Sequence, residues 1–390
     1  MMEERMYVGI DVAKESFDLC ILDSNGEPMA KRRKVPSSSN GFKELMDILH
    51  STGDIARIRI GMESTGIYHL SLLRYLRENG FTSKVFNGIE TRAMKSSRVR
   101  KSKTDAVDAE AIATALMLPE HTETYEPPEN IANLREYVSS YNRISKKIKA
   151  VKNNIIRDLD IAFPGYTSKY DTLSDISIRT LSKYPTSSDF LKNIDEAEKE
   201  VPEKMFQFLK GKAMEHYINT YAHEAIRSEI LSLLRIGDVL KRELEEVKRK
   251  MEMEFNRIDN PIKTIPGIGP VTGSIIISKI GDIRRFDDPK KLVAYAGIDP
   301  VITQSGNRYG EASISKRGDG LLRMALYQTA LVGVICNPVI KGYYQRKLDE
   351  GMEKKKALVA CSRKLCHIIW KMWTDNKEFD PEVAKDALID

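Results

Sequence analysis

Two segments near the middle of the chain repeat apolar residues with the spacing of a coiled coil. The first seam passes through Leu134, Tyr137, Tyr141, Ile144, Ile148, Val151 and Ile155. The second passes through Ile226, Ile230, Leu233, Leu240, Leu244, Val247 and Met251, with Gly237 at its one weak position. Alternating steps of three and four residues place such side chains on one face of a long helix. The two helices therefore pair within one chain or form a coiled coil between two chains.

These seams divide the 390 residues into three regions. We expect a first domain over residues 1–128, a coiled-coil and helical region over 129–257, and a C-terminal, mainly α-helical domain over 258–390. The segment 160–222 separates the two seams and contains "FPGY" and "KYPTSSD", so we expect a small helical insertion there. The pattern assigns no function to this insertion.

The first domain alternates strand and helix patterns. "MYVGIDVAKESFDLCILDS" predicts two strands with a tight connection near Lys14 and Glu15, and "PMAKRRKVP", "IARIRIGMES" and "FTSKVFN" predict three more. "GFKELMDILHS" and "GIYHLSLLRYLRENG" have the apolar spacing of helices, the second ending at Gly80. This alternation predicts an α/β layer with a mixed sheet.

Four carboxylates follow or begin these elements. Asp11 and Glu63 stand at the ends of two predicted strands, and Asp105 and Asp108 begin a helical run. Helical spacing puts the last two on one face, so all four can converge at one sheet edge. Two Mg²⁺ ions need such a set of oxygen ligands, which suits an in-line phosphodiester displacement. Taken singly, each residue has another explanation as a turn residue, a helix cap or a first-turn acid.

A run of cations precedes that helix. It consists of Lys95, Arg98, Arg100, Lys101 and Lys103, with no acid among them. Such a patch neutralises several phosphates, and the net charge of +6 is compatible with nucleic-acid binding. The alternative is a solvated loop. With the carboxylates, the run predicts a nucleic-acid backbone held against a metal site.

The C-terminal domain opens with "PIKTIPGIGPVTGSIIISKIGDI", which predicts two short helical pieces around Gly267 and Gly269. A glycine-rich turn ahead of a helix exposes backbone N–H groups that bind a phosphate oxygen. The element is similar to a helix-hairpin-helix, a reader of the DNA backbone. The sequence contains no P-loop or GxGxxG motif.

Cysteine usage and hydropathy bear on the cellular compartment. Cys20, Cys336, Cys361 and Cys366 form no CxxC pair, and the N-terminus lacks the pattern of a signal peptide. The chain has no run of about 18 apolar residues. We expect a cytoplasmic protein with reduced thiols and no membrane partner. His367 lies beside Cys361 and Cys366 without zinc spacing, so we expect these three to be packing residues.

Several long motifs resemble one family. "YVGIDVAKESFDLCILD", "GMESTGIYHLSLLRYL", "KSKTDAVDAEAIA", "IPGIGPVTGSIIISKIGDIRRF", "LVAYAGIDP", "QSG", "ISKRGDGLLRMALYQTA" and "NPVIKGYYQRKL" are similar to the DEDD-type insertion-sequence transposases. The motifs follow the family's order and cover nearly all of the chain except the insertion at 160–222. The resemblance implies an RNase H-like (RuvC-like) first domain, a coiled-coil region and a C-terminal transposase domain with a catalytic serine.

Carried onto this sequence, the family's acidic tetrad falls on Asp11, Glu63, Asp105 and Asp108, and its serine on Ser305. The resemblance implies a transposase or recombinase that cuts and rejoins DNA through a serine nucleophile. The active site would combine the metal domain of one protomer with the serine domain of another in a homo-oligomer, a dimer or a tetramer. A structured RNA encoded by the element would pair with donor and target DNA.

The residues around Ser305 leave alternatives open. A serine hydroxyl is a poor nucleophile until its proton is removed, and no histidine is adjacent. Ser313 and Ser315 are near in sequence. Lys316, Arg317 and Arg323 are candidates for phosphate contacts, and their alternative is a basic helix surface.

Three other functions fit part of this pattern. A RuvC-like Holliday-junction or structure-specific nuclease needs the carboxylates but no serine. A sugar-kinase or actin-like ATPase also carries an Asp in its first strand, but it needs further phosphate loops that the sequence lacks. A DNA-binding scaffold needs only the hairpin and the coiled coil. Serine dependence separates the recombinase from the nuclease.

Overall fold

The computed structural model describes residues 5–29, 33–63, 68–86, 105–117, 128–215, 223–301, 304–305, 308–309 and 313–386. The chain divides into two compact units, Met1–Glu126 and Pro127–Asp390. A mixed α/β sheet forms the first unit, and the second is mostly helical. The predicted α/β class of the first region and the helical character of the remainder are confirmed at this level.

The first unit is built on a five-stranded sheet of order β3-β2-β1-β4-β5. Its strands are β1 (Met6–Val12), β2 (Ser16–Leu22), β3 (Arg33–Pro36), β4 (Ile58–Glu63) and β5 (Ser83–Phe86). Strands β1, β2 and β3 pair antiparallel, whereas β4 and β5 continue parallel to β1. The predicted first strand pair is confirmed. Strand β4 starts later than expected, because Asp54 caps a short 3-10 helix over Ile55–Arg57.

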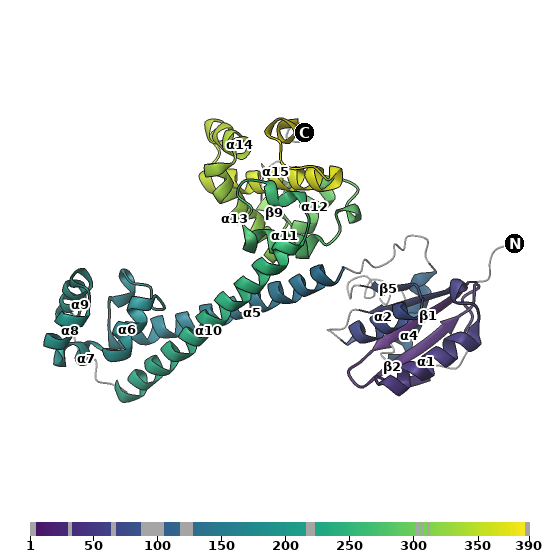
Figure 1. Cartoon of the computed structure of the whole chain (residues 1–390), viewed down its shortest axis with the longest axis horizontal. Helices are drawn as coiled ribbons and strands as arrows, with labels where there is room; N and C mark the ends of the chain where they lie inside the picture. Colours follow the sequence, from purple (N-terminus) through teal and green to yellow (C-terminus); the bar gives the residue numbers. More distant parts are fainter. Residues whose placement is uncertain are drawn as a thin grey trace. The chain divides into compact units, whose positions relative to one another are not determined.

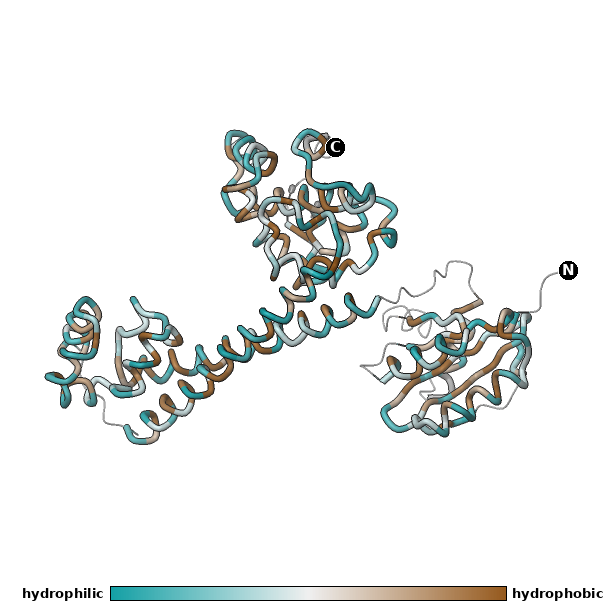
Figure 2. Tube along the Cα trace, in the orientation of Figure 1, coloured by the Kyte–Doolittle hydropathy of each residue, from teal (hydrophilic) through white to brown (hydrophobic). Residues whose placement is uncertain are grey.

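Helices cover both faces of this sheet. Helices α1 (Ser39–Thr52) and α2 (His69–Glu78) pack on the face formed by alternate residues such as Val8, Ile10 and Ile60. Helix α4 (Asp105–Leu116) lies on the other face, against β1, β2 and β4 (Figure 1). Hydrophobic residues run along the inner strands (Figure 2). Their burial on both faces explains why these strands are nearly continuous apolar runs.

The second unit contains the two predicted seam helices, α5 (Glu129–Ala162) and α10 (His223–Arg257), packed side by side (Figure 1). Leu134 and Met251 share one buried cluster near one end of the pair, and Ile155 and Ile230 share another near the opposite end. Of the two arrangements the sequence allowed, pairing within the chain is therefore present.

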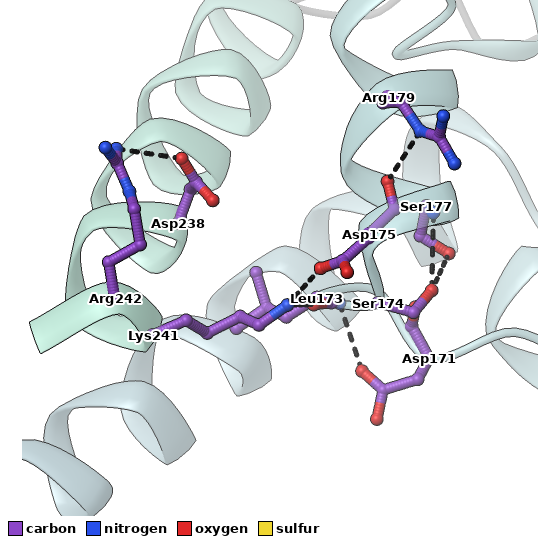
Figure 3. Close-up of polar contacts among 9 residues, drawn as sticks. All are labelled: Asp171, Leu173, Ser174, Asp175, Ser177, Arg179, Asp238, Lys241 and Arg242. Atoms are coloured by element: carbon purple, nitrogen blue, oxygen red, sulfur yellow. Dashed lines mark hydrogen bonds and ion pairs between the residues drawn. The ribbon is translucent and has the colours of Figure 1, made fainter. Parts of the chain in front are cut away.

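The insertion is helical, as predicted. It comprises α6 (Asp175–Lys183), α7 (Ser187–Lys192), α8 (Ile194–Glu200) and α9 (Glu203–Glu215). A Cβ added to Gly237 would lie 2.6 Å from Leu173 Cδ2, so the gap in the second seam accommodates this leucine. Lys241 Nζ donates 2.7 Å hydrogen bonds to Leu173 O and Asp175 Oδ1 (Figure 3). The weak seam position is thus one docking point of the insertion on α10, and the ion pair of Arg227 with Asp189 is another.

The C-terminal part is a helical layer around α15. Its elements are a 3-10 helix (Pro261–Thr264), α11 (Pro270–Ile280), a second 3-10 helix (Ile283–Arg285), α12 (Pro289–Ala296), α13 (Gly320–Cys336), α14 (Pro338–Asp349), α15 (Lys354–Asp375) and α16 (Pro381–Asp386). Cys361, Cys366 and His367 are buried on α15, which confirms their packing role. All four cysteines are free thiols.

Two short strand pairs interrupt this helical part. Strand β6 (Pro300–Val301) pairs with β9 (Ser313–Ile314), and β7 (Gln304–Ser305) pairs with β8 (Arg308–Tyr309). The sequence patterns did not predict these strands. In the part of the chain that the structure describes, no single helix has the length and apolar composition to cross a membrane. Only α13 and α14 together, bent by 95°, meet that test.

Candidate active site

Two of the predicted carboxylates lie side by side at the carboxyl ends of parallel strands. Strands β1 and β4 pair in the register Ile10 with Met62, so Asp11 and Glu63 follow that pair on adjacent strands. Both side chains are half-buried. Because alternate residues point to opposite faces, Asp11 and Glu63 lie on the face opposite the Val8 and Ile10 side chains.

Helix α4 is seated on that same face by two glycines. A Cβ on Gly9 would lie 2.0 Å from Ala109 O, and a Cβ on Gly61 would lie 3.0 Å from Ile112 Cγ2. Gly9 and Asp11 share a face, as do Gly61 and Glu63, because each pair is two residues apart. The absence of side chains at these glycines therefore lets the helix lie directly on the strands beside the carboxylates.

The direction of α4 brings its acidic end to the same edge. Its last residues approach Gly26, whose added Cβ would lie 3.5 Å from Met117, and Met117 also packs near Tyr7 at the start of β1. The helix therefore runs opposite to β1, and its first turn lies toward Asp11. Asp108 is half-buried in that first turn. Asp105 begins the helix as predicted, while its side chain lies outside the described residues.

A further carboxylate on this face was not predicted. Asp18 of β2 is the direct cross-strand partner of Asp11 and is half-buried. Like charges directly opposite each other destabilise a sheet. On its other side, Asp18 has Lys34 of β3 as its cross-strand neighbour, and opposite charges across a strand pair stabilise it. The alternation in "SFDLCIL" could have revealed Asp18, because Phe17, Leu19 and Ile21 share the other face.

This set of oxygens has the chemistry of a site for a divalent cation. Such hard cations take carboxylate oxygens and complete their shell with water and substrate phosphates, so one or two carboxylates per ion are enough. Among the side chains that the structure describes, no three acidic, histidine or cysteine groups converge as a ready ligand cluster. We call the side of the sheet that carries Asp11, Asp18, Glu63 and the first turn of α4 the carboxylate face. Lys95, Arg98, Arg100, Lys101 and Lys103 lie outside the described residues.

The candidate serine lies in the second unit. Ser305 is in β7, directly opposite Arg308 in β8, and its side chain lies outside the described residues. The base of this hairpin is fixed where β6 meets β9 and where Ser315 Oγ donates a 2.5 Å hydrogen bond to Asp299 Oδ1. Ser315 is therefore engaged inside the fold, whereas Ser313 is exposed.

The three candidate phosphate-binding cations differ in their surroundings. Lys316 and Arg317 are exposed in the turn before α13, and Lys316 has a positive φ of 54°. Arg323 is half-buried, and its Nη1 donates a 2.9 Å hydrogen bond to Ala296 O. Its guanidinium therefore has a structural contact within the domain. Asp319 caps the start of α13 and pairs with Lys279 at 3.0 Å.

The two glycines of the predicted hairpin also have different surroundings. Gly267 has φ of 102°, and an added Cβ would lie 3.0 Å from Thr329 O and from Gly333 N of α13. Only glycine fits there, for conformational and steric reasons. Gly269 is the N-cap of α11, and nothing lies within 4 Å of the direction of its missing side chain. The open side of this turn is therefore at Gly269.

Two family profiles match this chain. A profile of DEDD transposases of IS110 type, described as a transposase, matches residues 8–164. A second profile, described as the transposase of the IS116/IS110/IS902 family, matches residues 259–345. The chain belongs to the IS110-type DEDD transposases. The first match contains the four predicted carboxylates, and the second contains Ser305.

Relatives of this transposase extend over nearly its whole length. An uncharacterized 44.8 kDa protein of insertion element IS116 from Streptomyces clavuligerus is 23% identical over 97% of both chains. A pilin gene-inverting protein from Moraxella bovis is 23% identical over 97% of this chain and 99% of its own. A mini-circle putative transposase for IS117 from Streptomyces coelicolor is 24% identical over 89% and 88%.

The family membership establishes the general activity. The chain is a DNA transposase, and DNA is its substrate. A DEDD transposase domain uses divalent metal ions. The predicted identification with this family is confirmed by both profiles.

Proposed function

We propose that this transposase cuts and rejoins DNA by using Mg²⁺ held by Asp11, Glu63, Asp105 and Asp108 and the hydroxyl of Ser305 as the nucleophile. The observation that supports the metal site is the shared face of Asp11, Glu63 and the first turn of α4. The strand order of the sheet supports an RNase H-like (RuvC-like) first domain. We further propose that two Mg²⁺ ions bind.

The carboxylates would hold the ions and orient them toward a phosphate of the DNA. Bound Mg²⁺ lowers the pKa of a coordinated oxygen and neutralises charge on the phosphate. Ser305 Oγ would then attack phosphorus, its proton passing to a base at the metal face. The new Oγ–P bond forms as one P–O bond of the strand breaks, and that strand end leaves as a hydroxyl. Attack by a second strand's hydroxyl on the same phosphorus would release Ser305 and rejoin the DNA.

The remaining expectations complete this proposal. We propose a homo-oligomer, a dimer or a tetramer, in which the carboxylates of one protomer act with Ser305 of another. An element-encoded RNA would pair with donor and target DNA. The DNA backbone would be held by the helix-hairpin-helix at Gly267 and Gly269, by Lys316, Arg317 and Arg323, and by the cations between Lys95 and Lys103. The free thiols support action in the cytoplasm.

The test is a covalent-adduct assay with the full-length protein, Mg²⁺, the element's flanking RNA and labelled donor and target DNA. We expect a protein–DNA adduct with the wild type and none with Ser305→Ala or Asp11→Asn. Ser313→Ala is the matched control, because Ser313 is exposed and lies in β9, at the base of the β7–β8 hairpin. Loss of the adduct in Ser313→Ala, with Ser305→Ala still forming it, would move the nucleophile to that residue.

The same assay separates the recombinase from its rival. Cleavage that survives Ser305→Ala and produces no adduct would make the enzyme a RuvC-like junction or structure-specific nuclease, which hydrolyses DNA with the carboxylates alone. Omission of the RNA tests the guide: unchanged joining without RNA would remove that part of the proposal.

A further inference from the structure

We propose that the exposed cations at the middle of α5 bind the phosphate backbone of the substrate DNA duplex. The basic stripe consists of Arg143, Lys146, Lys147 and Lys149. The inference rests on DNA being the substrate, which the family establishes, and is independent of which residues cut it. No residue of α5 belongs to the metal or serine sites described above.

The stripe is an unusual concentration of one charge. Residues 137–157 of α5 contain six cations and no Asp or Glu. Residues three and four apart are neighbours on a helix, so Arg143 lies beside both Lys146 and Lys147. Such like-charge pairs destabilise a helix. A helix that carries several of these pairs is less stable than one with alternating charges, unless an anion neutralises them.

The partner helix shows the opposite arrangement. On α10, Arg242 pairs with Asp238 at 3.0 Å, and Lys248 pairs with Glu245 at 2.7 Å. Arg249, Lys250 and Arg257 also pair with glutamates of their own helix. On α10, cations are thus mostly paired with carboxylates, although Arg235 donates to Ser232 Oγ instead. Among the residues that the structure describes, a limited part of α5 carries cations without such pairs.

The uncompensated part has clear limits along α5. Toward the C-terminus of α5, Lys152 pairs with Asp171 and Arg157 pairs with Asp158 and Glu229. Toward its N-terminus, Arg135 donates to Ser278 O. Between these, within the part of the chain that the structure describes, none of the four stripe residues pairs with a carboxylate within 4.0 Å. The guanidinium of Arg143 donates a 2.8 Å hydrogen bond to Ser139 Oγ of its own helix.

The stripe is also accessible. All four of its side chains are exposed. Up to Ile144, the apolar residues of α5 pack into the buried cluster that contains Leu134 and the C-terminal helices. From Ile148 onward they pack into the cluster that contains Ile155 and the helices of the insertion. The stripe therefore lies where the helix pair passes from one globular core to the other (Figure 1).

Its dimensions match a nucleic-acid backbone. Lys149 lies six residues after Arg143 on the helix, a rise of about 9 Å at about 1.5 Å per residue. Duplex DNA carries one negative charge per about 1.7 Å of its axis, so about five phosphate charges lie along that length. Four cations on flexible side chains are commensurate with that number. Small anions would not need a row of this length, and an acidic peptide lacks such a regular array.

The experiment compares two variants of the full-length protein that lose the same charge. The test variant is Arg143→Gln, Lys146→Gln, Lys147→Gln and Lys149→Gln, and the control is Lys248→Gln, Arg249→Gln, Lys250→Gln and Arg257→Gln on α10. Affinity for a labelled DNA duplex is measured over a range of salt concentrations without divalent metal, so that the DNA stays uncut. Parallel titrations use the element's flanking RNA, and melting temperatures report folding.

We expect the stripe variant to bind DNA about 10- to 100-fold more weakly at low salt and to lose about 3–4 from the slope of log K against log salt, since each phosphate contact contributes about 0.9. Its melting temperature should stay the same or rise, because like-charge repulsion is removed. The control should change the slope by less than about 1. Equal losses in both variants, or no loss in either, would overturn the proposal, and so would a loss confined to RNA.

Discussion

At the scale of single residues, Gly9 permits a closer approach of α4 to the sheet than Gly61 does. A methyl group at Gly9 would lie 2.0 Å from Ala109 O and 2.5 Å from Ala113 N, both backbone atoms that cannot rotate away. We expect Gly9→Ala to displace α4, to destabilise the first unit by about 1–3 kcal/mol, and to abolish DNA cleavage, because Asp105 and Asp108 move with the helix. Urea unfolding and the adduct assay measure both effects.

The control for this substitution is Gly211→Ala. Gly211 lies in α9, and nothing lies within 4 Å of its missing Cβ. Alanine should stabilise that helix by about 0.5–1 kcal/mol and leave DNA cleavage unchanged. Normal activity in Gly9→Ala would show that the close contact between α4 and β1 is not required.

A second prediction at the residue scale concerns pH. Burial raises the pKa of the Asp319 carboxyl. The hydrogen bond from the Leu322 amide and the Lys279 ammonium lower this pKa by more than burial raises it, so the pKa lies below its ordinary value. A depressed pKa means that the carboxylate stabilises the fold at neutral pH and that this contribution is lost as pH falls below about 4. Asp319→Ala should cost about 1–2 kcal/mol at pH 7.

The wild type and Asp319→Ala differ in the urea concentration at which they are half unfolded. This difference should become smaller as pH is lowered toward about 3, because the wild-type carboxyl becomes protonated. Asp319→Asn keeps an N-cap oxygen but loses the charge, so its loss at pH 7 should be smaller than that of alanine. A difference that stays constant across this pH range would rule out a charge-dependent role for Asp319.

At the scale of elements, the insertion is held on α10 by a leucine that enters the space above a glycine. Gly237→Leu would restore the apolar seam but occupy the site of Leu173, whose Cδ2 lies 2.6 Å from the added Cβ. We expect this substitution to destabilise the protein by about 1–3 kcal/mol. It should also expose the segment around Leu173 to limited proteolysis.

The matched experiment is a double-mutant cycle. Leu173→Ala removes the side chain that meets position 237, so the combined Leu173→Ala and Gly237→Leu variant should be less destabilised than the sum of the single variants. Strict additivity would contradict the proposed fit between these two residues. Lys241→Gln tests the polar half of the same contact, because its Nζ bridges Leu173 O and Asp175.

At the scale of the whole molecule, the two units have separate hydrophobic cores. The cluster around Val8 and Leu45 belongs to residues before 127, and the cluster around Ile276 and Ile369 to residues after it. We expect calorimetry of the full chain to show two unfolding transitions. Gly9→Ala should shift only one of them, and Ile276→Ala, which removes a buried side chain worth about 2–5 kcal/mol, only the other.

A single transition shifted equally by both substitutions would show that the units unfold cooperatively. In that case Gly9→Ala would lower the stability of the C-terminal helices as well, and its effect on activity could not be assigned to the carboxylate face alone. A fluorescence probe at Trp370, whose indole donates to Phe286 O in the second unit, distinguishes these results.

The amino-acid sequence by itself determined the local elements and the places of the candidate residues. The heptad spacing gave both long helices, because a 3.5-residue repeat has no other compact solution. The positions of the carboxylates at strand ends and at a helix start were also predictable, because the local pattern of neighbouring residues predicts where each strand or helix begins and ends. The family motifs then pointed to transposition and to Ser305, which remains a prediction together with the other site residues.

Only the tertiary structure decided which elements meet. Pairing of α5 with α10 within one chain, and the docking of Leu173 at Gly237, depend on contacts between residues far apart in sequence. Asp18 joins the carboxylate face because of strand register, and Arg323 is held inside its domain by a carbonyl 27 residues away. A sequence pattern reports the face on which a side chain lies, whereas packing determines what covers that face.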